Sequence, residues 1–165
     1  MRILGIDASL RSTGLAVIEQ QAGRLSAVEY AQIKNPTTLP HSSCLRRVHE
    51  EVVAVLKRCE PAAAAIEGGF YFKNARTALV LGEVRGVVIA ACASAGVAIY
   101  EYSPRLVKQA LTGFGAAQKD QVSKMVMGML GLKESPQEDA ADALAIAICH
   151  LQNQSTIAAL KSEPI

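Results

Sequence analysis

The segment that most restricts the fold is short and wholly apolar: it runs from Ala62 to Ile66 and is closed by Glu67. A helical pattern precedes it, and Gly68-Gly69 follows it. A strand with apolar side chains on both faces has to be covered on both sides, as in parallel sheets flanked by helices. The segment therefore predicts a buried parallel strand and an α/β fold.

Four more β-like runs complete a predicted five-stranded mixed sheet flanked by helices. Three of them follow one another closely and predict antiparallel strands, and a fourth comes later: residues 2–7, 13–20, 25–33 and 97–102. Periodicity, caps and prolines predict helices from Ser42 or Ser43 to before Pro61, and over about 75–95, 104–113, 117–130 and 138–152. We expect one domain over residues 1–152 and a frayed tail over 153–165.

The composition fits a cytoplasmic α/β protein. Hydrophobic residues make up 50% of the chain and aromatic residues only 4%. The four cysteines show no CxxC spacing and fall in apolar or helical contexts, so we expect reduced core thiols and a cytoplasmic location. Val87 to Tyr100 is the longest uncharged apolar stretch. Its length fits a buried helix followed by a strand, so we expect no membrane span.

Four acids stand where an unpaired carboxylate is costly. Asp7 ends the apolar run that begins at Ile3, Glu67 ends the run described above, and Asp139 and Asp142 open an apolar helix. If the first and fourth strands are parallel neighbours, Asp7 and Glu67 lie together at the carboxyl ends of their strands. Asp139 and Asp142 share one helical face, which can point toward Asp7. Simpler interpretations exist, because Asp also favours turns and helix N-termini.

Taken together, the carboxylates predict a site for hard divalent cations. Two carboxylates about 4 Å apart repel by roughly 4 kcal/mol at an effective dielectric constant of about 20, and Mg²⁺ between them reverses the sign. Oxygen ligands suit Mg²⁺ or Mn²⁺. Two such ions can activate a water and stabilise the leaving oxygen of a phosphoryl displacement, which is the chemistry of nucleases.

These residues also carry a resemblance to a known family, the RuvC-type Holliday-junction resolvases. The chain is similar to that family from Ile3 to about His150. The matching elements are Leu4-Gly5-Ile6-Asp7, Thr13-Gly14, Ala65-Ile66-Glu67, Phe70, Lys73-Asn74-Ala75, Leu81-Gly82, Arg85-Gly86, Val107-Lys108-Gln109, Lys119, Gln121-Val122, Pro136-Gln137 and the run from Asp139 to Ala147. One departure is clear: Ala8-Ser9-Leu10 stands where family members usually carry Pro-Gly after the first acid.

The resemblance implies an RNase H-like nuclease, a homodimer, and paired symmetric nicks in four-way (Holliday) DNA junctions during recombination and repair. It implies two Mg²⁺ ions per subunit, which Mn²⁺ can replace, and suggests cooperation with the branch-migration helicase complex. By matching position, the metal ligands would be Asp7, Glu67, Asp139 and Asp142, and the DNA contacts Phe70, Lys108 and Lys119. Lys119 would also support catalysis. Weaker candidates for backbone binding are Lys73, Arg76 and Arg105.

Two local questions stay open. Gly82, Gly86 and Ala90 recur every four residues and leave a smooth strip on the long helix, which faces either the sheet or a second subunit. The family's dimer, built around this helix, favours the second subunit. Phe70 either projects from its glycine-flanked loop to stack on bases or folds onto the core.

Two rival functions also remain. An actin-like or sugar-kinase-like ATPase fragment would use the same strand, Asp, turn and Thr-Gly for nucleotide phosphates, although 165 residues supply only one of its two halves. A non-catalytic junction-binding domain of the same fold would tolerate loss of an acid, whereas all four acids are present. His41, His49 and His150 show no metal-binding spacing, so we expect surface or core roles for them.

Overall fold

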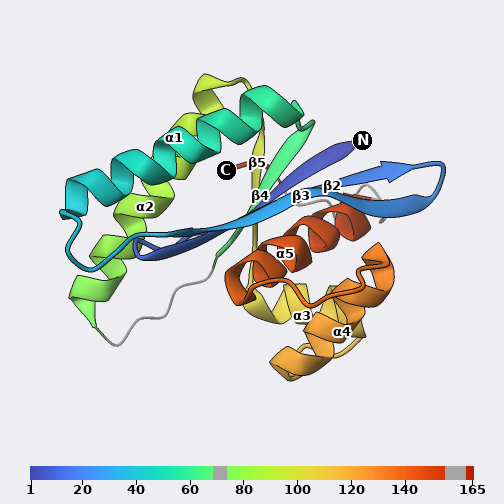
Figure 1. Ribbon diagram of the computed structural model, residues 1–165. Coiled ribbons are helices and arrows are strands. Elements are labelled where there is room, and N and C mark those ends of the chain that lie inside the picture. Colours follow the sequence, from blue (N-terminus) through green and yellow to red (C-terminus); the bar gives the residue numbers. More distant parts are fainter. Residues whose placement is uncertain (69–73, 155–162) are drawn as a thin grey trace.

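The computed structural model describes residues 1–68, 74–154 and 163–165. It contains a five-stranded mixed sheet in the order β3-β2-β1-β4-β5, with helices on both faces (Figure 1). The strands are β1 (Arg2–Asp7), β2 (Ser12–Gln21), β3 (Arg24–Lys34), β4 (Ala63–Glu67) and β5 (Ile99–Tyr102). β1, β2 and β3 pair antiparallel, whereas β4 runs parallel to β1 and to β5. The predicted sheet and its class are confirmed.

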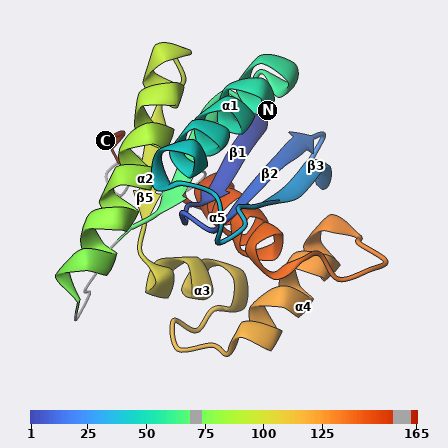
Figure 2. The same ribbon diagram turned by 60° about the vertical axis from the view of Figure 1, so that its left-hand side comes forward.

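In the part of the chain that the structure describes, five helices cover the sheet. They are α1 (His41–Cys59), α2 (Ala75–Ser94), α3 (Pro104–Thr112), α4 (Lys119–Leu130) and α5 (Glu138–Gln154). α1 and α2 lie on one face, and α3, α4 and α5 on the other (Figures 1 and 2). Each face has its own apolar cluster. β4 is therefore buried between two layers, as its apolar run from Ala63 to Ile66 predicts.

Local capping explains where α3 begins and ends. The Ser103 side chain accepts a hydrogen bond from Leu106 N at 3.3 Å, Pro104 occupies the first turn, and Gly113 ends α3 with φ of 76°. That prediction is confirmed. The predicted serine cap of α1 is wrong, because the helix begins earlier, at His41, after Pro40. α4 begins at Lys119, two residues later than predicted.

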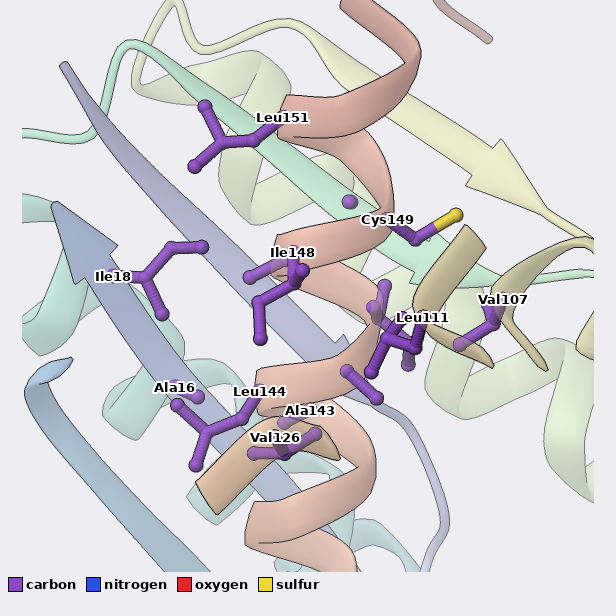
Figure 3. Packing of buried hydrophobic residues seen from close by; sticks show 14 of the residues in the cluster. Ala16, Ile18, Val107, Leu111, Val126, Ala143, Leu144, Ile148, Cys149 and Leu151 are labelled. Atoms are coloured by element: carbon purple, nitrogen blue, oxygen red, sulfur yellow. The ribbon is translucent and has the colours of Figure 1, made fainter. Parts of the chain in front are cut away.

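The glycines of β1 and β2 let α5 approach the sheet closely. A Cβ on Gly5 would lie 2.0 Å from the carbonyl oxygen of Ala143, and one on Gly14 would lie 1.9 Å from that of Asp139. Gly14 pairs with Asp7 across the two strands. The start of α5 therefore rests beside the end of β1. Behind it, Leu144, Ile148 and Leu151 pack in the apolar cluster shown in Figure 3.

Helix α2 is buried on one side only. Its buried residues are Val84, Val88, Ala91 and Cys92. The other side carries Gly82 and Gly86, each with open space where a Cβ would be, and Leu79, which is 66% exposed. By length and a mean hydropathy of 1.6 this helix could cross a membrane, and 22% of that window is buried in the chain. The stretch from Val87 to Tyr100 thus forms the predicted helix end followed by a strand, but the helix is only partly buried within the single chain.

The turn after Asp7 is well anchored despite lacking the Pro-Gly pair. The buried Thr13 side chain donates to the carbonyl oxygen of Ser9 at 2.5 Å, and the side-chain amide of Asn35 donates to that of Leu10 at 2.7 Å. Leu10 itself is 8% exposed and belongs to the apolar cluster under α1 and α2. Among the described residues, the positive φ values of non-glycine residues occur at Ala22 and Glu60, so this turn needs no glycine.

Candidate active site

The carboxyl ends of β1 and β4 place two acids side by side. Ile6 pairs with Ile66 in the parallel register, so Asp7 and Glu67 follow on adjacent strands at the same edge. Both side chains are half-buried. This is the arrangement that the sequence predicts, and it lies at the position where open α/β sheets hold ligands.

The first turns of α5 bring the other two acids to the same edge. Asp139 lies over Gly14, the residue paired with Asp7, and Asp142 follows one helical turn later. The electrostatics show that these groups are near one another. Asp142, Glu67 and Asp139 all raise the pKa of Asp7 by repulsion. Elements far apart in the sequence therefore bring four carboxylates to one edge of the sheet.

The cluster carries unfavourable negative charge. Burial, followed by repulsion from Asp142, Glu67 and Asp139, raises the pKa of Asp7 from 3.8 to about 7. Burial and then Asp142 also raise the pKa of Glu67, against the opposing effects of Lys119 and Lys108. Because burial and repulsion disfavour the ionised form of these carboxylates, a bound cation would stabilise that form strongly. The donor set thus fits a hard divalent metal in its chemistry.

Two of the acids are held by other side chains. The hydroxyl of Ser12 and the amide of Gln32 both donate to Oδ2 of Asp139, and Gln32 Nε2 also donates to Ser12 Oγ at 2.8 Å. Lys119 Nζ lies 2.8 Å from Asp142 Oδ2. Within residues 1–68, 74–154 and 163–165, no three acidic, His or Cys side chains yet surround one point. Asp139 is instead held by Ser12 and Gln32, and Asp142 by Lys119.

Lys119 bridges two acids beside the cluster. Its Nζ lies 2.6 Å from Glu138 Oε1 as well as 2.8 Å from Asp142 Oδ2. Partial burial lowers the pKa of Lys119, but the hydrogen bonds to Asp142 and Glu138 outweigh it and raise the pKa overall. Lys119 is therefore a permanent cation at the edge of the site.

A cavity of about 210 Å³ opens next to the acids. Its polar lining consists of Glu67, Asp142, Lys108 and Lys119. Its floor is apolar and comes from α3, α4 and α5. The two predicted phosphate-binding lysines thus converge from different helices, α3 and α4, on the two acids that face the cavity.

The remaining predicted DNA contacts are less central. Phe70 and Lys73 lie outside the described residues. Arg76 is exposed in the first turn of α2. Arg105 is exposed on α3, where its side chain lies against Gly115 in the following loop. The histidine predictions are confirmed: His41 pairs with Glu83 at 2.6 Å on the surface, and His150 is buried in the core. All four cysteines are free and buried, as predicted.

Arg85 connects α2 to the end of β4, where the site begins. Its guanidinium donates to the carbonyl oxygen of Glu67 at 3.0 Å and pairs with the Glu101 carboxylate on β5. A Cβ on Gly68 would collide with the Glu101 side chain, so the strand end, the arginine and Glu101 are packed together. The backbone of Glu67 is held from two neighbouring elements.

The partners that hold the acids and Lys119 in place were not predicted from the sequence: they are Ser12, Gln32, Arg85, Glu101 and Glu138. Glu101 had a usable signal, because it is a charged residue near the end of an otherwise apolar strand. Ser12 and Gln32 had none. They lie 127 and 107 positions from Asp139 in the sequence, and only the pairing of β2 with β3 brings them together.

The chain as a whole is similar to known proteins. A sequence model described as "Crossover junction endodeoxyribonuclease RuvC" matches residues 3–150. The chain belongs to the RuvC family. It is 47% identical over 155 residues to the RuvC of Myxococcus xanthus, which covers 93% of this chain and 81% of that one. With the RuvC of Syntrophomonas wolfei it shares 42% over 163 residues, 98% of this chain and 95% of the other.

The fold leads to the same family. The structure described as "T. thermophilus RuvC in complex with Holliday junction substrate" superposes with a TM-score of 0.92 at 36% identity, covering 100% of this chain and 99% of that one. RuvC proteins are metal-dependent nucleases. Family membership therefore decides against the ATPase alternative and against a non-catalytic domain.

Proposed function

We propose that this chain resolves four-way DNA junctions in recombination and repair by metal-dependent phosphodiester hydrolysis, with paired symmetric nicks. The observation that carries the proposal is the meeting of four carboxylates from β1, β4 and α5 at one edge of the sheet. Membership of the RuvC family supports the junction as substrate, because a Thermus relative of the same fold has been solved with such a junction.

The metal ligands in this proposal are Asp7, Glu67, Asp139 and Asp142. We propose two Mg²⁺ ions per subunit, which Mn²⁺ can replace. Bound ions of this kind supply an activated water and stabilisation of the leaving oxygen. The chain prepares the ligands: Ser12 and Gln32 fix the orientation of the Asp139 carboxylate through its Oδ2 atom.

The lysines of the cavity are proposed to hold the scissile phosphate. Lys108 and Lys119 line the same cavity as Glu67 and Asp142, so a phosphate entering it meets two ammonium groups. Lys119 can exchange Asp142 or Glu138 for a phosphate oxygen and thereby support catalysis. Further backbone and base contacts are proposed for Phe70, Lys73, Arg76 and Arg105.

The proposed dimer uses the exposed side of α2. Gly82, Gly86 and Leu79 lie on that side, where small residues permit close approach of a second helix. The mean hydropathy of 1.6 over a helix that is mostly unburied supports burial against a partner. A two-fold dimer would present two acidic sites to a nearly two-fold junction, and paired nicks follow from that symmetry.

The chain is further proposed to act in the cytoplasm together with the branch-migration helicase complex. Four free, buried thiols fit a reducing compartment. The helicase contact rests on the family alone.

The proposal is tested with synthetic four-way junctions and linear duplexes of the same sequence, incubated with the purified dimer and Mg²⁺. We expect paired nicks in the junction and a largely intact duplex. Asp7→Asn and Glu67→Gln should bind the junction without cutting it, because they lose a metal ligand. Glu51→Gln is the matched control, since Glu51 is an exposed acid on α1.

Equal cutting of junction and duplex would overturn the proposed substrate. Cutting by Asp7→Asn at the rate of Glu51→Gln would overturn the proposed ligand set. Activity that persists in EDTA would contradict the metal dependence.

A further inference from the structure

Phe114 is a large, exposed aromatic side chain that the site described above leaves unused. It lies in the loop between α3 and α4 and is 64% exposed. A single exposed hydrophobic residue needs no explanation by itself. Its surroundings make this one informative, because the loop that carries it joins the two helices that bear the cavity lysines.

The loop presents Phe114 in a defined place. Thr112 Oγ1 accepts a hydrogen bond from Phe114 N at 3.2 Å and lies 2.7 Å from the carbonyl oxygen of Lys108. Ala117 N donates to the carbonyl oxygen of Phe114 at 3.1 Å. These contacts anchor the backbone on both sides of the aromatic residue. The exposure of the ring is therefore set by the loop and not by a frayed end.

The two helices that the loop joins carry cations. Lys108 precedes it on α3, and Lys119 opens α4 directly after it; both line the cavity with Glu67 and Asp142. The side chain of Arg105 packs against Gly115, so closely that a Cβ there would lie 2.7 Å from its Cγ atom. In Figure 2 the loop lies at the same end of the molecule as the start of α2.

We propose that Phe114 is a second base-contacting residue, which stacks on an unpaired or unstacked DNA base next to the scissile phosphate. The inference rests on the proposed function, which brings DNA to this cavity. Proteins hold single-stranded nucleic acid with cations on the phosphates and aromatic rings on the bases, and this loop combines the two. Bases within a duplex are already stacked on each other. Phe114 thus selects distorted DNA over regular duplex.

The chain contains no Trp, so Phe114→Trp introduces a single indole as a direct reporter. We expect its emission to be quenched and shifted when a four-way junction is added without Mg²⁺, and to change much less with linear duplex. Val28→Trp is the control, because Val28 is exposed at 41% on β3, away from the cavity. Emission that is unchanged by the junction, or that changes as it does in Val28→Trp, overturns the proposal.

Affinity supplies a second measurement on the same protein. Phe114→Ala should weaken junction binding about tenfold, with duplex binding unchanged, and Phe114→Tyr should keep the wild-type affinity. Junction affinity of Phe114→Ala equal to that of the wild type would overturn the role of the ring. Wild-type binding and nicking are measured first. If the wild type neither binds nor nicks junctions, the proposed function fails. If the wild type does both, but the Phe114→Trp emission is unchanged by added junction and the junction affinity is unchanged by Phe114→Ala, the stacking proposal alone fails.

Discussion

Arg85 donates a hydrogen bond to the carbonyl oxygen of Glu67 at 3.0 Å, and this bond connects the middle of α2 to the last residue of β4. The same guanidinium pairs with Glu101. One side of α2 is exposed and the other holds the strand that carries a proposed metal ligand. A proposed dimer through α2 would therefore be coupled mechanically to the position of Glu67.

Arg85→Gln should slow nicking more than it weakens junction binding. The substitution removes the bond to Glu67 and leaves the half-buried Glu101 without this partner, at a cost of about 1 to 3 kcal/mol in stability. Single-turnover rates and junction Kd values separate the two effects. Arg85→Lys is the conservative comparison and should recover part of the rate. Equal losses in rate and affinity would contradict a positioning role.

Asp7→Asn should stabilise the metal-free protein at high pH. The pKa of Asp7 is about 7 in the folded chain and 3.8 in the reference state, so the folded state keeps a proton that the unfolded state releases. Stability therefore falls as pH rises from about 4 to 7 and then levels off. The neutral amide avoids this loss, which amounts to at most about 4 kcal/mol.

Urea unfolding in EDTA at pH 4, 6 and 8 measures this gain. It should be largest at pH 8 and vanish near pH 4. Added Mg²⁺ should raise the stability of the wild type at pH 8 and have little effect on Asp7→Asn, because ligand binding to the folded state alone stabilises it. A gain that is the same at all three pH values would refute the explanation by burial and repulsion.

Lys119→Ala should reduce nicking by about 100-fold or more, because a cation that stabilises developing charge on a phosphate is lost. Lys124→Ala is the matched control, since Lys124 is an exposed lysine on the same helix. In a salt titration of junction binding, Lys119→Ala should lower the slope by about one phosphate contact. An unchanged slope would show that Lys119 pairs only with Asp142 and Glu138.

His150 should make the fold sensitive to acid. It is fully buried, its Nδ1 lies 2.8 Å from the Tyr102 hydroxyl, and Gln154 Nε2 lies 2.8 Å from its Nε2. Burial lowers the pKa of His150 from 6.5 to about 4. Between these pH values the unfolded chain binds a proton at this histidine and the folded chain does not. The free energy of unfolding therefore decreases as pH falls from about 6.5 toward 4.

Comparison with His150→Gln isolates that effect from the opposite one of Asp7. Between pH 6.5 and 4 the wild type should lose up to about 3 kcal/mol relative to the variant. Denaturant midpoints at four pH values in this window provide the measurement. Parallel curves for the two proteins would contradict the assignment.

Leu79→Glu should convert the proposed dimer to a monomer. Leu79 is 66% exposed in the single chain and lies on the apolar side of α2, so a charge there would be buried only if the side meets a partner. Light scattering after gel filtration reads the mass directly. A wild type that is already monomeric, or a Leu79→Glu variant that stays dimeric, would place the interface elsewhere.

Much of the fold was predictable because its signals are local. The buried strand shows in the consecutive apolar residues from Ala63 to Ile66, the start of α3 in Ser103-Pro104, and its end in Gly113. The four acids were also recognisable, since each ends a strand or opens a helix whose apolar pattern is clear. Alternating and helical periodicities depend only on neighbours within a few residues, so a sequence displays them directly.

The contacts that orient those acids depend on tertiary structure. Ser12, Gln32 and Arg85 reach their partners only because strands pair and helices pack on the sheet. The one-sided burial of α2 has the same origin: its residues are apolar nearly all round, so periodicity could not tell the covered side from the open one. The sequence by itself determined which residues could form the site. The tertiary structure decided which partners hold them and which surface of α2 is left exposed, because those outcomes depend on contacts between residues distant in the chain.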